Sequence, residues 1–270
     1  MLRIVRILAQ TPASRTVALV FALNSILFGD WFARIPAVQQ ALSLSDGQLG
    51  LALLGMPVGS LVTLPVAGWL VARFGAGRVT WWSTLALCLA IPAPAFAVDA
   101  MTLALALALL GIANGAMDIA MNAEAAAIET RANLSMMASF HGMFSLGGII
   151  GAALGSLVAG LGISPALHLT VLGIAAVLLT LSRRGTLGVQ GPGPRGEAPV
   201  FALPRGPLIG LALVCLATML GEGAAADWSA VHLATNLGSG PILAGLGYAF
   251  FAAGMTAGRF SGDALRDRFG

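Results

Sequence analysis

The sequence has little charge and no lysine. Charged residues make up 9% of the 270 residues and hydrophobic residues 58%, whereas a soluble domain carries about 25% charge. This shortage of charge excludes a soluble globular enzyme, a disordered chain and a collagen-like fibre. The mean hydropathy of +0.91 indicates that lipid surrounds most of the chain.

Cysteine is scarce, and motifs for enzymatic chemistry are missing. Cys88 and Cys215 both lie in apolar stretches, which predicts two buried free thiols and neither a disulfide framework nor a metal site. The arginines form short clusters between apolar stretches, so we expect no nucleic-acid partner. Glycine-rich phosphate loops, H-E-x-x-H and nucleophile elbows are absent. We therefore expect no enzymatic activity, no cofactor and no metal.

Long apolar runs are what the chain does have. A membrane-spanning helix needs about 20 mostly apolar residues. Such runs predict eight spans, at residues 16–38, 47–72, 79–98, 100–128, 132–182 (two spans), 207–236 and 241–258. Gly162, Ser164 and Pro165 divide the run 132–182 into the fifth and the sixth span.

The arginines predict the orientation of these spans. When successive loops alternate between the two sides, every arginine except Arg34 falls on the same side as the N-terminus. Arginine-rich short loops stay in the cytoplasm, so we expect a cytoplasmic N-terminus. The segment 183–206, which contains Gly-Pro-Gly-Pro, predicts a flexible cytoplasmic linker. It separates a six-span unit at 1–182 from two further spans at 207–270.

A repeat relates the first two spans to the last two. Each pair begins with Asp-Trp and ends with Arg-Phe-Gly, and the two intervals are of similar length: Asp30-Trp31 to Arg73-Phe74-Gly75, and Asp227-Trp228 to Arg268-Phe269-Gly270. This pattern predicts two parallel repeats, the arrangement of the halves of a six-plus-six transporter.

The segment after the second span carries a motif, G-x-L-A-D-R-x-G followed by basic residues. Gly68, Leu70, Arg73 and Gly75 match it in register and Arg78 follows, but Ala72 replaces the acidic residue. In the second copy, at 263–270, the acidic residue is present as Asp267, with Arg268 and Gly270 after it, while Asp263 replaces the first glycine. With this motif, the chain resembles the major facilitator superfamily.

The resemblance implies an all-α membrane protein with a major-facilitator-type helical bundle. Here this means a six-span N-terminal half plus the first two spans of the second half, and we expect a product truncated after the eighth span. Residues 30–36 and 118–122 are broadly similar to bacterial proton-coupled sugar permeases of the fucose type. The resemblance also implies a monomer in the bacterial cytoplasmic (inner) membrane. It also implies that Arg73 and Arg78 stabilise the outward-open state through contacts with the other half on the cytoplasmic side. Retention of positively charged loops in the cytoplasm explains these two arginines nearly as well.

Ionisable residues within spans are costly, at about 2.5–3.5 kcal/mol for a central charge, and are therefore functional candidates. Asp118 lies between Asn114 and Asn122 at i−4 and i+4, so the three polar groups share one helical face. Proton exchange at Asp118 is one interpretation, and an interhelical hydrogen-bond cluster is the other. Glu222, in the middle of its span, and Asp227, nearer the outer end, are further candidates for proton coupling.

Other polar residues have two interpretations each. Asp30 and Arg34 are i, i+4 and predict an intrahelical ion pair, with an outer gate as the alternative. Trp31 and Trp228 suit either sugar stacking or the membrane interface, and Asn24 is a candidate cavity residue.

The fifth span contains a histidine and a glycine series. His141 is interpreted as a satisfied residue near the cytoplasmic interface. The series Gly147, Gly151, Gly155 predicts close helix packing. Ser156 stands where drug antiporters of the superfamily have proline.

These patterns favour a secondary active transporter that moves a small polar solute together with protons and lies in the lipid bilayer. A sugar-like solute is possible. The alternatives are an efflux antiporter of the same fold and an inactive membrane fragment or scaffold.

Overall fold

The structure is a computed structural model that describes residues 11–186 and 205–269. These residues form helices without any strand, and eight helical segments are long and apolar enough to cross a membrane. The predicted all-α membrane fold and its eight spans are therefore confirmed. Most of the predicted linker and Gly270 lie outside the described residues, as does the side chain of Asp267.

The helix bounds lie close to the predicted ones. The elements are α2 (Pro12–Ala41), α3 (Asp46–Leu53), α4 (Gly55–Phe74), α5 (Ala76–Ala90), the short 3₁₀ helix η1 (Ala93–Phe96), α6 (Ala100–Ala132), α7 (Met137–Gly160), α8 (Pro165–Ser182), α9 (Leu208–Thr235) and α10 (Pro241–Phe269).

The structure differs from the prediction at two places. The second span consists of two helices, α3 and α4, which meet at Leu54. The eighth span was predicted to end at about residue 258, but α10 stays helical to Phe269. The charged residues after 258 were interpreted as a loop, yet arginine, alanine and leucine are good helix formers and no proline interrupts them.

Helix starts follow from local capping chemistry. The Ser164 hydroxyl accepts a hydrogen bond from the Leu167 amide at 3.3 Å, and Pro165 occupies the first turn of α8. The same two residues divide the fifth and sixth predicted spans. Asp99 caps α6 in a reciprocal box with Thr102.

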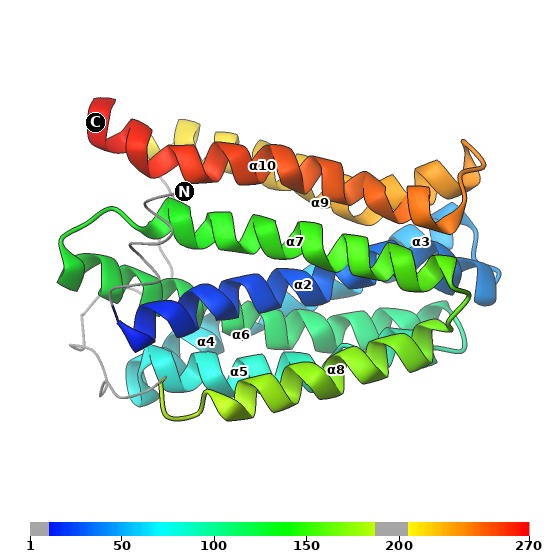
Figure 1. The fold of residues 1–270 in the computed structure, drawn as a ribbon, viewed down its shortest axis with the longest axis horizontal. Coiled ribbons are helices and arrows are strands. Elements are labelled where there is room, and N and C mark those ends of the chain that lie inside the picture. Colours follow the sequence, from blue (N-terminus) through cyan, green and yellow to red (C-terminus); the bar gives the residue numbers. More distant parts are fainter. Residues whose placement is uncertain (1–10, 187–204, 270) are drawn as a thin grey trace.

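The helices lie side by side along the long axis of the molecule, with α2 in the middle (Figure 1). In the apolar part of α2, 89% of the residues are buried, the largest share of any span. All described arginine side chains except Arg34 and Arg259 belong to one end of the bundle, where α2 begins and α10 finishes. We call this the arginine-rich end.

Glycine packing holds α7 against α2. A Cβ atom at Gly147 or Gly151 would overlap the backbone carbonyl of Ala22 or Ile26, and one at Gly155 would lie 2.9 Å from the Asp30 carbonyl oxygen. Only glycine lets the two backbones come this close. The predicted close packing by this glycine series is therefore confirmed.

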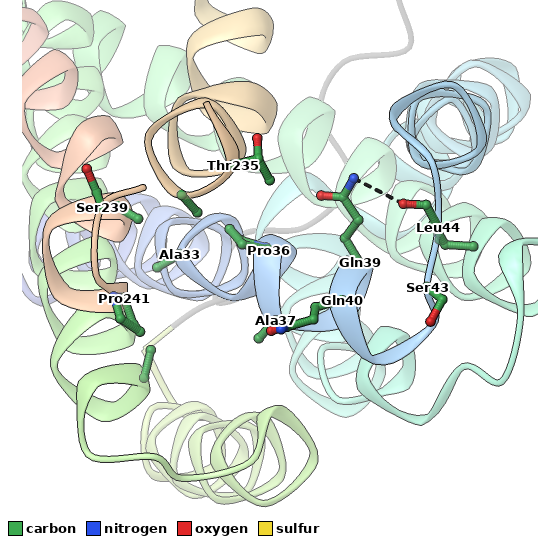
Figure 2. Close-up of a pocket in the computed structure, with 13 residues that line it drawn as sticks. Ala33, Pro36, Ala37, Gln39, Gln40, Ser43, Leu44, Thr235, Ser239 and Pro241 are labelled. Carbon is green, nitrogen blue, oxygen red and sulfur yellow. Dashed lines mark hydrogen bonds between the residues drawn. The ribbon is translucent and has the colours of Figure 1, made fainter. Parts of the chain in front are cut away.

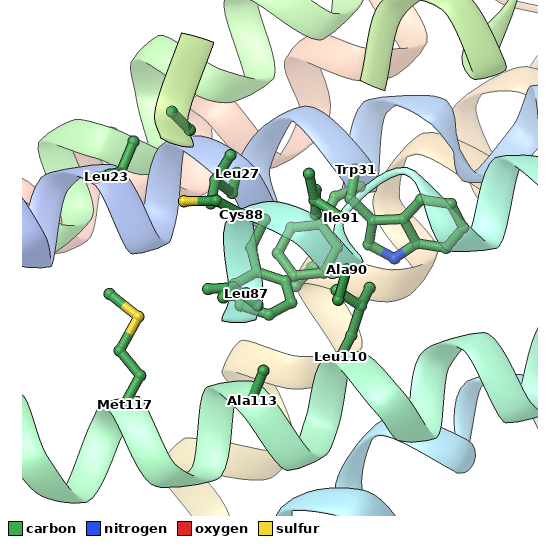
Figure 3. Close-up of a cluster of buried hydrophobic side chains, with 14 of the residues drawn as sticks. Leu23, Leu27, Trp31, Leu87, Cys88, Ala90, Ile91, Leu110, Ala113 and Met117 are labelled. Atoms are coloured by element: carbon green, nitrogen blue, oxygen red, sulfur yellow. The ribbon is translucent and has the colours of Figure 1, made fainter. Parts of the chain in front are cut away.

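A dry core forms between α2, α5 and α6. Figure 3 shows Trp31 from α2 among Leu87 and Ile91 at the end of α5 and Leu110 from α6. Cys88 belongs to this core, whereas Cys215 on α9 is exposed, so the predicted burial of both thiols is wrong for Cys215. Cys215 lies on a surface of α9 that also exposes leucines such as Leu211, which is typical of a spanning helix that faces lipid.

Candidate functional site

A cavity of about 480 Å³ lies between α2, α4 and α6 on one side and α7, α9 and α10 on the other. Five predicted site residues line it: Asn24, Asn114, Asp118, Asn122 and Glu222. The other lining residues are Phe28, Phe32, Met56, Met121, His141, Phe144, Met219, Gly223, Ala226, Tyr248 and Arg259.

The Asp118 carboxyl group faces this cavity and is held from its own helix. The Asn122 Nδ2 donates to Asp118 Oδ1 at 3.1 Å and to the Asp118 carbonyl at 2.8 Å. Because Nδ2 donates, the Asn122 Oδ1 is the acceptor atom, and His141 Nε2 lies 3.1 Å from it. His141 therefore carries a proton on Nε2. The result is a chain of directed hydrogen bonds from His141 through Asn122 to Asp118.

The third polar residue of the α6 face bonds to another helix. The Asn24 Nδ2, on α2, donates to Asn114 Oδ1 at 2.8 Å and lies 3.3 Å from Met117 Sδ. Asn24 is buried, with 2% of its surface exposed. The Asn114 amide NH₂ group is thereby left to face the cavity, because its oxygen is already occupied.

An ion pair crosses from α10 to α9 at the arginine-rich side of the cavity. The Arg259 Nη2 donates to Glu222 Oε2 at 3.0 Å and to Oε1 at 3.4 Å, while Nη1 donates to the Ser145 hydroxyl of α7 at 2.7 Å. The guanidinium also lies over the Phe144 ring, 5.8 Å from its centre. Arg259 therefore ties α10 to two neighbouring helices inside the membrane-spanning segment.

The position of Arg259 corrects the sequence-based assignment. Arg259 was counted among the loop arginines, but it lies within the span Pro241–Gly262 and faces the cavity. The one signal that could have found it is Glu222, since a carboxylate in the middle of a span calls for a nearby cation. His141 was interpreted as a satisfied residue near the cytoplasmic interface. It does have a hydrogen-bond partner, Asn122 of α6, and it also lines the cavity, which the sequence did not indicate.

Aromatic rings close one side of the cavity. Phe32 packs edge-on against Tyr248, with ring centres 5.1 Å apart, and Phe28 stacks on Phe32 at 6.0 Å. Tyr248 is 2% exposed. Among the described residues, no group of three or more His, Cys, Asp or Glu side chains is placed to hold a metal.

Four predicted residues lie elsewhere. Trp31 belongs to the dry core, and Trp228 packs over Gly50 of α3, 3.5 Å from the position of a Cβ atom there. Asp227 lies on α9 next to the lining residue Ala226 but does not line the cavity itself. The fourth, Asp30, is fully buried between α2, α7 and α8.

The surroundings of Asp30 differ from the predicted ion pair. Its Oδ1 lies 3.4 Å from His168 Nε2, on α8. Arg34 instead donates to the carbonyl of Ile163 in the α7–α8 connection. Among the described side chains no direct ion pair between Asp30 and Arg34 is formed, although the two charges still attract each other at longer range. Sequence reasoning missed His168.

The two copies of the motif share a local feature at the arginine-rich end. The Arg73 guanidinium lies 5.8 Å over the Phe74 ring, and that of Arg268 lies 5.3 Å over Phe269. Arg78 is exposed at the start of α5. In the first copy, a single residue, Gly75, joins α4 to α5.

The two glycines of the first motif have different environments. Gly75 has a φ of 87°, which side chains other than glycine rarely adopt. Gly68, by contrast, has open space around it. The Glu124 carboxylate of α6 lies near the Gly77 backbone amide at the start of α5. The α4–α5 junction therefore has a carboxylate nearby from α6, although the acidic residue of the motif is replaced by Ala72.

A second cavity, of about 590 Å³, lies at the opposite end of the bundle (Figure 2). Gln39, Gln40, Thr235 and Ser239 line it, and the Gln39 amide donates to the Leu44 carbonyl at 3.3 Å. The two cavities meet α2 at adjacent residues. Phe32 belongs to the first and Ala33 to the second, where Gly245 of α10 packs against Ala33.

A membrane-spanning bundle with polar cavities along one helix seam defines a class, the helical membrane transporters. The family follows from comparisons with known proteins. A model of the major facilitator superfamily matches residues 17–270, and the chain belongs to this superfamily.

Three curated relatives agree with this assignment. An uncharacterised MFS-type transporter of Yersinia pestis is 35% identical over 252 residues, which cover 93% of this chain and 65% of the relative. An uncharacterised transporter of Sinorhizobium fredii is 35% identical over 261 residues, covering 95% and 68%. The membrane protein MosC of Rhizobium meliloti is 34% identical over 259 residues, covering 94% and 62%. The chain spans about two thirds of the length of these relatives.

Proposed function

We propose that this chain carries out proton-coupled secondary transport of a small polar solute through the cavity between α2, α6, α7, α9 and α10. The observation that carries the proposal is the Asp118 carboxyl group, which is exposed to a cavity within the membrane-spanning bundle and held there by Asn122. Ionisable groups in such a place mark proton relays and solute pathways.

Proton exchange at Asp118 changes what the cavity can bind. The deprotonated carboxylate only accepts hydrogen bonds, whereas the protonated group also donates one. A solute hydroxyl can then be bound by Asp118 and by the free NH₂ group of Asn114. Asn122 and His141 act on the orientation of the carboxyl group and need not touch the solute.

The arrangement of helices supports alternating access, in which the proposed units at 1–182 and 207–270 expose the cavity first to one side of the membrane and then to the other. The unit at 1–182 contributes the cavity walls from α2, α4, α6 and α7, and the unit at 207–270 contributes those from α9 and α10. Small rotations between the two units would open one cavity and close the other. In this proposal the protein is a monomer in the bacterial cytoplasmic (inner) membrane, with its N-terminus in the cytoplasm. The fucose-type resemblance favours a hydroxylated solute.

The experiment uses proteoliposomes that enclose a pH-sensitive dye and receive a panel of sugars and sugar acids. The wild type should show proton movement when one of these solutes is added. Asp118→Asn should abolish this movement and leave solute binding measurable, because the amide keeps the shape but cannot exchange a proton. Asp99→Asn, at the exposed start of α6, serves as the control and should behave as the wild type. Unchanged proton movement in Asp118→Asn would remove this residue from the mechanism.

A further inference from the structure

Arg259 is a cation inside a membrane-spanning helix that the proton-coupling proposal does not use. Charged side chains inside spanning helices are costly and therefore mark functional positions. Its guanidinium has five N–H donors, and the structure engages them with one carboxylate and one hydroxyl, from Glu222 and Ser145. The position therefore needs an explanation in terms of what the cation binds.

The Arg259–Glu222 pair remains open to the cavity. The side chains are 27% and 24% exposed, and both line the cavity wall. The two carboxylate contacts are unequal, at 3.0 and 3.4 Å, and both come from the same nitrogen, Nη2. A tight fork-to-fork pair would use two nitrogens. Another carboxylate that enters the cavity can therefore compete with Glu222 for the guanidinium.

Other titratable groups face this pair from the surrounding helices. They are Asp118 from α6, His141 from α7 and Tyr248 on α10, and Tyr248 also has Asp227 of α9 as an electrostatic neighbour. The α2 wall contributes Asn24 and two phenylalanines but no titratable side chain. Arg259 is therefore the single permanent cation among the described residues that line the cavity.

We propose that Arg259 docks a carboxylate of the transported solute, and that Glu222 occupies its place when the cavity is empty. The inference rests on the proposed transport function and names its substrate class. When the solute carboxylate binds Arg259, Glu222 is displaced and takes up a proton. The cavity thereby gains one anion and one proton, so its net charge does not change on loading.

The cavity wall formed by α6, which faces the Arg259–Glu222 pair, indicates more about the substrate class. The amide groups of Asn114 and Asn122 and the Asp118 carboxyl group lie on α6, away from the pair on α9 and α10. Phe28, Phe32 and Phe144 line the cavity beside them. The volume of about 480 Å³ is that of a site for one small molecule. These features fit a hydroxylated monocarboxylate, with its carboxylate on Arg259 and its hydroxyl groups toward α6.

The test measures binding and proton uptake together on the purified protein in detergent. The probes are sodium gluconate, lactate and benzoate, with sorbitol as the neutral counterpart of gluconate. At least one carboxylate should bind with uptake of about one proton, and its Kd should rise as the pH rises, because a deprotonated Glu222 competes for Arg259. Glu222→Gln should bind the same probe with about one proton fewer taken up than in the wild type, and with a Kd that depends less on pH. Sorbitol should bind more weakly than gluconate.

Variants of Arg259 decide whether the cation is the docking group. Arg259→Gln alone leaves Glu222 unpaired, so the double variant Glu222→Gln, Arg259→Gln is compared with Glu222→Gln. Losing charge-assisted hydrogen bonds should raise the Kd of the carboxylate by about tenfold or more. Arg15→Gln, an exposed arginine at the start of α2, should leave the Kd unchanged.

Three outcomes overturn the inference: none of the carboxylates binds, the double variant binds them as tightly as Glu222→Gln, or binding takes up no proton. The proposed function fails separately, when Asp118→Asn retains the proton movement driven by a neutral sugar, whose binding does not displace Glu222. A transporter that moves sorbitol with protons but ignores the carboxylates would keep the proposed function and refute this substrate class.

Discussion

At the scale of single residues, hydrogen-bond direction decides what the cavity presents to a solute. The Asn122 side chain can rotate to exchange its oxygen and nitrogen. The Asp118 backbone carbonyl, which only accepts, favours the orientation in which the nitrogen meets Asp118, and an Nε2 proton on His141 stabilises the same orientation. Edge-on packing of Phe21 against the His141 ring, with centres 5.3 Å apart, holds that histidine in place.

This dependence predicts different effects for two substitutions of His141. His141→Gln keeps a donor that can reach Asn122 and should retain most of the solute-driven proton movement. His141→Leu removes the donor, and losing a hydrogen bond worth about 0.5–1.5 kcal/mol should slow this movement by roughly two- to tenfold. Dye-filled proteoliposomes give both rates. Equal rates in the two variants would show that the hydrogen bond does not orient the carboxyl group.

The buried Asp30 shows the opposite situation, a charged group that reaches no cavity. Asp30, Arg34 and His168 are almost fully buried, and among the described residues the Asp30 carboxylate oxygens, the Arg34 Nε and the His168 Nδ1 have no hydrogen-bond partner. Groups of this kind fix the mutual arrangement of helices, because removing one leaves its partner unpaired in a dry environment. We therefore assign these residues a structural role between α2 and α8.

At the scale of helices, the bundle depends on how closely α2 and α7 approach. Gly151→Ala would place a methyl group against the Ile26 carbonyl of α2, whose backbone cannot move without shifting the whole helix. The substitution should lower the unfolding temperature in detergent by several degrees or abolish the folded protein, since overpacking costs about 1–3 kcal/mol. A thermal melt of the purified protein measures this effect.

Gly254→Ala on α10 is the matched control. No atom outside the local α10 backbone lies within 4 Å of the added Cβ, and alanine is favoured over glycine in a helix by about 1 kcal/mol. This variant should be as stable as the wild type or slightly more stable. If both variants lost stability to the same extent, the cost would come from glycine replacement in general and not from the α2–α7 contact.

Much of the element scale could be predicted from the sequence, because the length of apolar runs and the capping residues act locally. Ser164 and Pro165 place the start of α8, and the spacing of Asn114, Asp118 and Asn122 places them on one face. What that face meets is not local. The repeated Asp-Trp pair shows this limit: Trp31 is buried in the core while Trp228 packs over α3, because the two helices have different neighbours.

Arg259 and His168 were missed for the same physical reason. A sequence shows that a charge lies near a predicted helix end, but the helix continues when tertiary contacts satisfy that charge. Glu222 and Ser145 do so for Arg259, and they lie far from it along the chain. Pairings between helices that are distant in sequence depend on packing, which the periodicity of one helix does not encode.

At the scale of the whole molecule, the arrangement of arginines predicts how the bundle sits in the membrane. The side chains at the arginine-rich end should face the cytoplasm, since positively charged short loops are retained there. Alkaline phosphatase is active only outside the cytoplasm, and green fluorescent protein fluoresces in the cytoplasm, so paired fusions report the side. Fusions after Gly206, before α9, should fluoresce, and fusions after Gly238, between α9 and α10, should show phosphatase activity. Fusions after Gly162, between α7 and α8, should also show phosphatase activity. Reports of the same side from Gly206 and Gly238 would contradict a span at α9. Phosphatase activity after Gly206 together with fluorescence after Gly238 would agree with all eight spans but would refute the orientation inferred from the arginines.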